Sequence, residues 1–313
     1  ILAVSIRDND QLVLTKIAAS GEIDTSFGSS GTVEYDLSTG GLTGFNEVTM
    51  TSSGKVIVGG GPGSTSYLIV DPSLAPGSGM FTEYGGGVSL PAYSNFAAGT
   101  AGTYALALVD IAGVDNYVIG RMNADGYPDT SFGGIGIKFL AQNPPTDFAI
   151  PSDAFYGYSR IDEADDGSIV ISSAVDNGTL ILKVDPLTGQ PVDTFGNNGY
   201  IYLEGTAVSR LLATDAVYVA SQVNLNPGTY MSVSKIDLTT GDLDSGFGSG
   251  GTLNLSVGAT SADEWESLTS PMIALSDGSI LLSGYVDAVV AQGGGLGASG
   301  YAHENWFVKM NPD

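Results

Sequence analysis

One short motif recurs along this chain. The stretch "GEIDTSFGSSG" begins at Gly21, and related stretches begin at Gly126 ("GYPDTSFGGIG"), Gly189 ("GQPVDTFGNNG") and Gly241 ("GDLDSGFGSGG"). A weaker copy, "FTEYGGG", begins at Phe81. A catalytic residue is usually needed once, whereas a residue that shapes a fold is needed in every repeat. The recurrence therefore predicts a repeat architecture.

The spacing and content of the repeats indicate which architecture. The motif aromatics lie 48 to 63 residues apart, at Phe27, Tyr84, Phe132, Phe195 and Phe247. Each interval contains about four short runs rich in Val, Ile and Leu, such as "DDGSIVISSA" and "TLILKVDPLTG". No window shows a helical period over ten residues. Four-stranded units of this size, repeated around an axis, are typical of a β-propeller.

We therefore expect an all-β protein, a β-propeller of about six four-stranded blades with incomplete terminal blades. The 313 residues would form a single domain of six repeats, at approximately 1–40, 41–90, 91–140, 141–204, 205–256 and 257–313. The first repeat lacks its opening strand and the last its closing strand. Either the chain, which begins at Ile1, is trimmed, or a neighbouring subunit donates a strand and links propellers into a filament.

The motif has a physical interpretation at each position. Its glycines permit tight turns, and its aspartate accepts hydrogen bonds from backbone N–H groups across a turn. Its phenylalanine fills the groove between neighbouring blades, where its burial stabilises the fold by about 2 kcal/mol. The candidate structural residues are Asp24, Phe27, Gly28, Asp129, Phe132, Gly133, Asp193, Phe195, Gly196, Asp244, Phe247 and Gly248.

A basic residue recurs at one place in the third strand of five repeats. These residues, half of the ten Lys and Arg in the chain, are Lys16, Arg121, Lys183, Lys235 and Lys309. A sparse residue type at one repeat position indicates a structural role. We expect each cation to pair with a motif acid of its own or the adjacent repeat, at Asp24, Asp129, Asp193 or Asp244.

The segment "RMNADGYPDTSFGGIG" at Arg121–Gly136 resembles the delta-60 repeat of bacterial proteins. The copies at Leu12–Gly31, Leu182–Gly199 and Lys235–Gly251 depart further from that pattern, and the copy at Tyr67–Gly87 has lost both the cation and the aspartate. The resemblance implies a propeller-like fold on secreted or surface proteins. It carries no established catalytic residues.

Composition narrows the functional classes. The net charge of −24 repels phosphate backbones, so nucleic-acid binding is not expected. The absence of cysteine excludes disulfides, thiol catalysis and cysteine metal sites. The chain contains no run of about 18 apolar residues, which is the length that a membrane-spanning helix needs. Acidity, few lysines and 45 glycines favour an extracellular or cell-surface location.

Four segments carry residues suited to chemistry. The single histidine, His303, lies beside Glu304 and Trp306, and "DEWES" surrounds Trp265. An aromatic platform with carboxylates is what sugar binding or glycoside hydrolysis uses, whereas a packing role for Trp306 is the simpler interpretation. The acids of "IDEADDG" and "NADGYPD" offer oxygen ligands for calcium, but neither has the spacing of an EF-hand loop.

The sequence thus favours a non-enzymatic, extracellular structural or adhesive β-propeller that self-associates in a surface assembly or filament. It predicts no catalytic residues and no cofactor, and leaves calcium open. The alternative is a carbohydrate-binding or carbohydrate-cleaving propeller with a site near Trp265 or His303, Glu304 and Trp306, in which case glycans are the partners.

Overall fold

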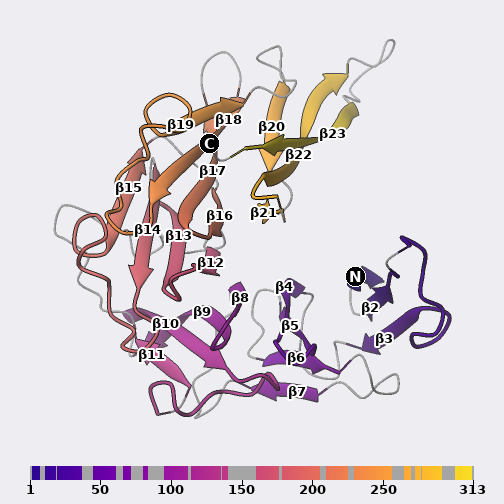
Figure 1. Ribbon diagram of the computed structural model, residues 1–313. Coiled ribbons are helices and arrows are strands. Elements are labelled where there is room, and N and C mark those ends of the chain that lie inside the picture. Colours follow the sequence, from indigo (N-terminus) through magenta and orange to yellow (C-terminus); the bar gives the residue numbers. More distant parts are fainter. Residues whose placement is uncertain are drawn as a thin grey trace. The chain divides into compact units, whose positions relative to one another are not determined.

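The computed structural model describes most of the chain and resolves it into strands. The described residues are 2–7, 11–18, 20–36, 45–60, 66–71, 80–83, 95–111, 114–134, 136–139, 160–175, 178–204, 209–224, 229–255, 264–268, 272–275, 277–290 and 300–311. Every regular element among them is a β-strand (Figure 1). These ranges hold no helix that could span a membrane.

The strands form six antiparallel sheets, numbered here I to VI in chain order. Sheet I contains β1 (Leu2–Arg7), β2 (Gln11–Lys16) and β3 (Thr32–Asp36); sheet II contains β4 (Phe45–Met50), β5 (Val56–Gly60), β6 (Ser66–Val70) and β7 (Met80–Glu83); sheet III contains β8 (Asn95–Gly99), β9 (Gly102–Ile111), β10 (Val114–Met122) and β11 (Ile137–Phe139). Sheet IV contains β12 (Arg160–Glu163), β13 (Ile169–Val175), β14 (Gly178–Val184) and β15 (Tyr200–Glu204); sheet V contains β16 (Ser209–Ala213), β17 (Ala216–Asn224), β18 (Thr229–Asp237) and β19 (Thr252–Leu255); sheet VI contains β20 (Glu264–Leu268), β21 (Ile273–Ala274), β22 (Ile280–Val290) and β23 (Gly300–Met310).

The all-β class is as the sequence predicts, but six four-stranded blades are not confirmed. Sheet I has three strands among the described residues. In sheet VI, β23 pairs along the whole of β22, so β20 and β21 share the other edge of β22 and the sheet is three strands wide. Sheets II to V have four strands each, in chain order or its reverse.

The chain divides into two compact units. Unit 1 comprises residues 1–142 with 187–189, and unit 2 comprises residues 143–186 with 190–313. Unit 1 holds sheets I to III and unit 2 holds sheets IV to VI. The single-domain organisation and the six repeat boundaries stay predictions.

Within each unit the sheets stack face to face through apolar side chains. In unit 1, Leu12 and Leu14 of sheet I pack with Val56 and Val58 of sheet II. In unit 2, the clusters join sheet IV to sheet V and sheet V to sheet VI. The strand β14 is buried along its whole length.

The glycine after each motif phenylalanine has a backbone that other residues adopt only with strain. Gly28, Gly196 and Gly248 have φ values of 55°, 56° and 56°. A Cβ at Gly196 would collide with the carbonyl oxygen of Tyr200, which accepts the N–H of Asn197 and closes the turn. The glycine is therefore required both by its dihedral angle and by a close backbone approach.

We predict that Gly196→Ala destabilises the fold more than Gly167→Ala. Gly167 also has a positive φ, of 80°, but a Cβ there meets no atom within 4 Å. Both variants carry a left-handed strain of about 1–2 kcal/mol, and only Gly196→Ala adds a collision, worth about 1–3 kcal/mol. Urea unfolding of the two variants measures the difference. Equal losses in the two variants would show that the close approach at Gly196 does not matter.

Candidate functional site

The repeated cation and the motif aspartate meet in three of the repeats. Lys16 Nζ lies 2.9 Å from Asp24 Oδ2, and the Arg121–Asp129 and Lys235–Asp244 pairs are separated by 2.8 and 2.9 Å. In each repeat the backbone N–H of the aspartate also donates to the carbonyl oxygen of the cationic residue. The motif turn therefore folds back onto the end of the strand that carries the cation.

Hydrogen bonds and charge keep these aspartates ionised. The Ser26 hydroxyl, followed by Lys16, lowers the pKa of Asp24 to about 2. The Ser131 hydroxyl is the largest cause of the lowered pKa of Asp129, and Lys235 is the largest cause for Asp244. Each acid thus stays charged opposite its cation at neutral pH.

The fourth motif departs from this arrangement. Val192 occupies the place of the aspartate, since its N–H donates to the carbonyl oxygen of Lys183 and its own carbonyl accepts the N–H of Phe195. Asp193 comes one residue later and is exposed. Lys183 Nζ instead binds Asp166 Oδ2 at 2.8 Å. The expected pairing of Lys183 with Asp193 is wrong, because "QPVDTFG" places its acid one position too late.

A second acid position supplies the partner of Lys183 and of Lys309. Asp166 and Asp277 occupy equivalent Asp-Gly turns, before β13 and β22. Asp277 binds Lys309 at 2.6 Å. Although burial alone would raise the pKa of Asp166, hydrogen bonds from Lys183 and Ser168 lower it. The pKa of Asp277 is lowered in the same way, mainly by Lys309.

In the fourth repeat, the cation and the phenylalanine also reach the following sheet. Lys183 is 5% exposed and donates to the carbonyl oxygen of Leu238, which directly follows β18 of sheet V, at 2.8 Å. Phe195 is fully buried and packs with Val217 and Val219 of sheet V. The Lys183 ammonium lies 5.8 Å from the centre of the Phe195 ring, within the range of a cation–π contact. These two side chains therefore join sheet IV to sheet V.

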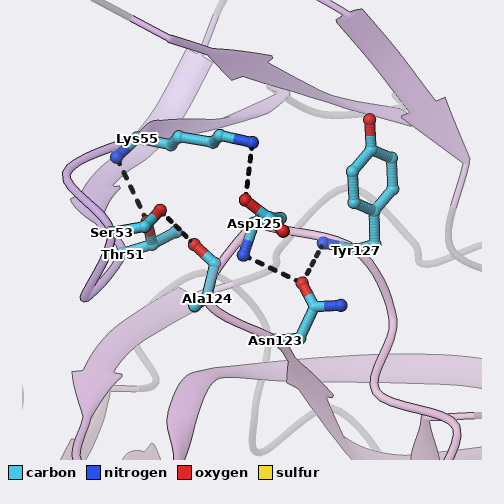
Figure 2. A network of polar contacts seen from close by, with 7 residues as sticks. All are labelled: Thr51, Ser53, Lys55, Asn123, Ala124, Asp125 and Tyr127. Atoms are coloured by element: carbon cyan, nitrogen blue, oxygen red, sulfur yellow. Dashed lines mark hydrogen bonds and ion pairs between the residues drawn. The ribbon is translucent and has the colours of Figure 1, made fainter.

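A polar network connects sheets II and III (Figure 2). Lys55, after the β4–β5 turn, binds Asp125 at 2.8 Å, and Ser53 Oγ donates to the carbonyl oxygen of Ala124. Asn123 Oδ1 accepts the N–H groups of Asp125 and Tyr127, which holds the loop in place. The side chain of Asp125, in the proposed calcium segment "NADGYPD", thus already has a cationic partner.

Two acids of "IDEADDG" also have partners. Asp162 Oδ2 accepts the N–H of Ala213 in sheet V at 2.9 Å, and burial raises the pKa of Asp162 to about 6. Asp166 is bound to Lys183. Within the described ranges, no group of three or more His, Cys, Asp or Glu residues is placed to hold a metal ion. The sequence leaves calcium binding open, and these contacts do not test it.

Sheet VI brings the two aromatic segments together. Trp265 of β20 is the cross-strand partner of Asp287 in β22, which in turn is opposite His303 of β23. In the next row Glu266, Val286 and Glu304 are opposite one another. The sequence did not single out Asp287, because its part in this row depends on strand register rather than on a motif.

Trp306 belongs to the core rather than to this row. It is 8% exposed and packs with Met231 and Ile280 in the cluster between sheets V and VI. Its indole Nε1 is buried with no hydrogen-bond partner in the described part of the chain. This position agrees with the packing role favoured by the sequence. Tyr84 of the weak motif copy and Asp263 lie outside the described residues.

We predict that Lys183→Met destabilises the protein by about 1–3 kcal/mol, because it removes a buried donor from both Asp166 and the carbonyl oxygen of Leu238. Lys309→Met is the matched control. Its pair with Asp277 is half-exposed on both sides, so the loss should be smaller. Chemical denaturation of both variants is the measurement. A loss for Lys183→Met no greater than for Lys309→Met would contradict the structural role of Lys183.

Comparisons with known proteins give similar folds at low identity. No family model and no curated protein sequence matches the chain, so the resemblance to the delta-60 repeat is unconfirmed. A protein of unknown function from Bacteroides caccae matches with 12% identity and a TM-score of 0.44, over 90% of this chain and 81% of its own. The aldose sugar dehydrogenase of Streptomyces coelicolor, in its PQQ-bound form, matches with 16% identity and a TM-score of 0.43, over 85% and 82%.

A structure from a study of two prolyl endopeptidases is also similar, with 13% identity and a TM-score of 0.40 over 92% of this chain and 39% of the endopeptidase chain. The similar structures are of the β-propeller type and include enzymes. The prediction that this chain is not an enzyme is therefore contradicted. At 12–16% identity, these enzymes assign no activity to it.

Proposed function

We propose that this chain is a structural or adhesive scaffold of the β-propeller type that associates with further copies of itself outside the cell. The observation that supports the proposal is the use of the repeated motif. Phe195 and Lys183 are buried between two sheets, where they make apolar, ionic and carbonyl contacts. Two residues of the repeated motif thus hold sheets IV and V together, which is the task of a scaffold.

The chemistry of the surface supports a location outside the cell. The net charge of −24 favours solubility, and a chain without cysteine cannot be altered by thiol oxidation outside the cell.

Several of the ten basic residues form ion pairs with acids, among them Lys55 with Asp125 and Arg7 with Glu34. The remaining surface charge is therefore strongly negative, and neighbouring copies repel one another at low salt.

Sedimentation velocity across a range of protein and salt concentrations tests the scaffold proposal. We expect the mean sedimentation coefficient to rise with protein concentration, and to rise further at high salt because screening weakens the repulsion between acidic copies. A single monomeric species at every concentration and salt condition would refute self-association.

A carbohydrate-binding role is the second candidate. It is supported by the cross-strand row of Trp265, Asp287 and His303, which places an aromatic, a carboxylate and an imidazole on adjacent strands of one sheet. Aromatic rings stack on sugar faces, while carboxylate and imidazole groups hydrogen-bond hydroxyls. The row has the residue types that a glycan requires.

Tryptophan fluorescence can test the carbohydrate role, because the chain has only two tryptophans and Trp306 is in the core. We expect a panel of soluble β-1,4-linked and α-1,4-linked hexasaccharides to change the emission of the native protein, and the change to disappear in Trp265→Phe. A Ser20→Ala variant, altered at an exposed turn far along the chain, should keep the response. No response to any hexasaccharide, or an undiminished response in Trp265→Phe, would count against this candidate.

A further inference from the structure

One face of sheet VI carries large apolar side chains that are open to solvent. Phe307 is 73% exposed and Ile273 is 48% exposed, and Leu281 between them is partly exposed. Ile273 is the cross-strand partner of Leu281, and Phe307 is opposite Ser283, two residues further along β22. These three residues, called here the Phe307 face, therefore occupy one side of the sheet.

The opposite side of sheet VI is buried against sheet V. Ile280, Leu282 and Met310 are all under 7% exposed and pack with Met231 and Val233 of sheet V. Because side chains alternate along a strand, this core face and the Phe307 face are the two sides of the same sheet. Sheet VI is thus covered by protein on one side only in its described part.

The repeat shows what normally covers the Phe307 face. Phe307 lies two residues before the repeated cation Lys309, and the equivalent residues Leu14, Ile181 and Val233 are each 0% exposed. Leu14 packs with Val56 and Val58 of sheet II, Ile181 with Val217 and Val219 of sheet V, and Val233 with Ile280 and Leu282 of sheet VI. In every one of these cases the cover is an apolar sheet face.

The exposed face of sheet I does not offer such a cover. Its exposed positions include Ser5, Arg7 and Glu34, and Arg7 is paired with Glu34 across the face. Setting an aromatic face against this one would desolvate an ion pair, which costs free energy. Among the described sheet faces, the partner that matches the Phe307 face in chemistry is a second Phe307 face.

We propose that the Phe307 face is the contact through which two copies of this chain associate, face to face about a two-fold axis. A two-fold contact uses the same patch on both subunits, so an apolar face meets an apolar face. Lys309 and Asp277 are half-exposed at its edge, so each copy presents both a cation and an anion at the rim of the contact. The inference rests on the proposed self-association and names the surface responsible for it.

Removing the apolar anchor should weaken the association. We expect Phe307→Asp to weaken self-association at least about tenfold, since an exposed aromatic in the contact is replaced by a charge. Leu187→Asp is the matched control, because Leu187 is 75% exposed and lies in a turn outside the Phe307 face. It should associate as the native protein does. Phe307→Ser and circular dichroism verify that the charge itself does not unfold the chain.

A single cysteine reports the symmetry directly, because the chain has none of its own. Phe307→Cys and Leu187→Cys, each carrying one nitroxide label, are compared by pulsed electron paramagnetic resonance at a concentration where copies associate. We expect a short, narrow distance between the two labels at position 307 and none of that kind at position 187.

Each outcome decides the inference. Association that survives Phe307→Asp, or open-ended polymers in which the labels at position 307 stay far apart, overturns the two-fold contact and leaves the scaffold proposal standing. A protein that remains monomeric at all concentrations overturns both. Loss of association in Phe307→Asp alone, with a short distance at position 307, supports both.

Discussion

The buried Lys183 illustrates the contact on which the stacked sheets depend. Its ammonium joins an acid of its own sheet to a backbone carbonyl of the next sheet, while its neighbour Phe195 fills the apolar space between the two. A buried ammonium is tolerated only if it is paired and hydrogen-bonded. Because both partners are present, the lysine fixes how sheet IV meets sheet V, which apolar packing alone specifies less tightly.

The repeats satisfy this requirement in two ways. Where the motif supplies an aspartate, as at Asp24, Asp129 and Asp244, the counterion comes from the turn that follows the strand carrying the cation. For Lys183 and Lys309 the counterion comes from the Asp-Gly turn that precedes β13 or β22. A repeat can therefore lose its motif acid and keep its ion pair, as long as the other turn provides a carboxylate. Divergence of the motif sequence does not imply loss of the contact.

The sequence was sufficient for the all-β class and for the Lys16–Asp24, Arg121–Asp129 and Lys235–Asp244 pairs, because both follow from local patterns. Glycine positions, short apolar runs and the recurring cation are visible within about ten residues. The pairing of Lys183 with Asp166 was not visible, since it depends on a one-residue shift in the fourth motif and on a turn 17 residues away. The row of Trp265, Asp287 and His303 likewise depends on the register of three strands. The width of sheet VI was missed because β20 and β21 use one edge of β22 in succession.

The central claim is that the motif couples a sheet to the sheet that follows it within the same unit, and hydrogen exchange in a Phe195→Ala variant tests it most directly. Removing a fully buried ring leaves a cavity between sheets IV and V. The account predicts faster amide exchange in β16 and β17 of sheet V as well as in β14 of sheet IV, with β5 and β6 of sheet II unchanged. Faster exchange confined to β14 and its own motif turn would show that Phe195 stabilises only its own repeat, and would contradict the account.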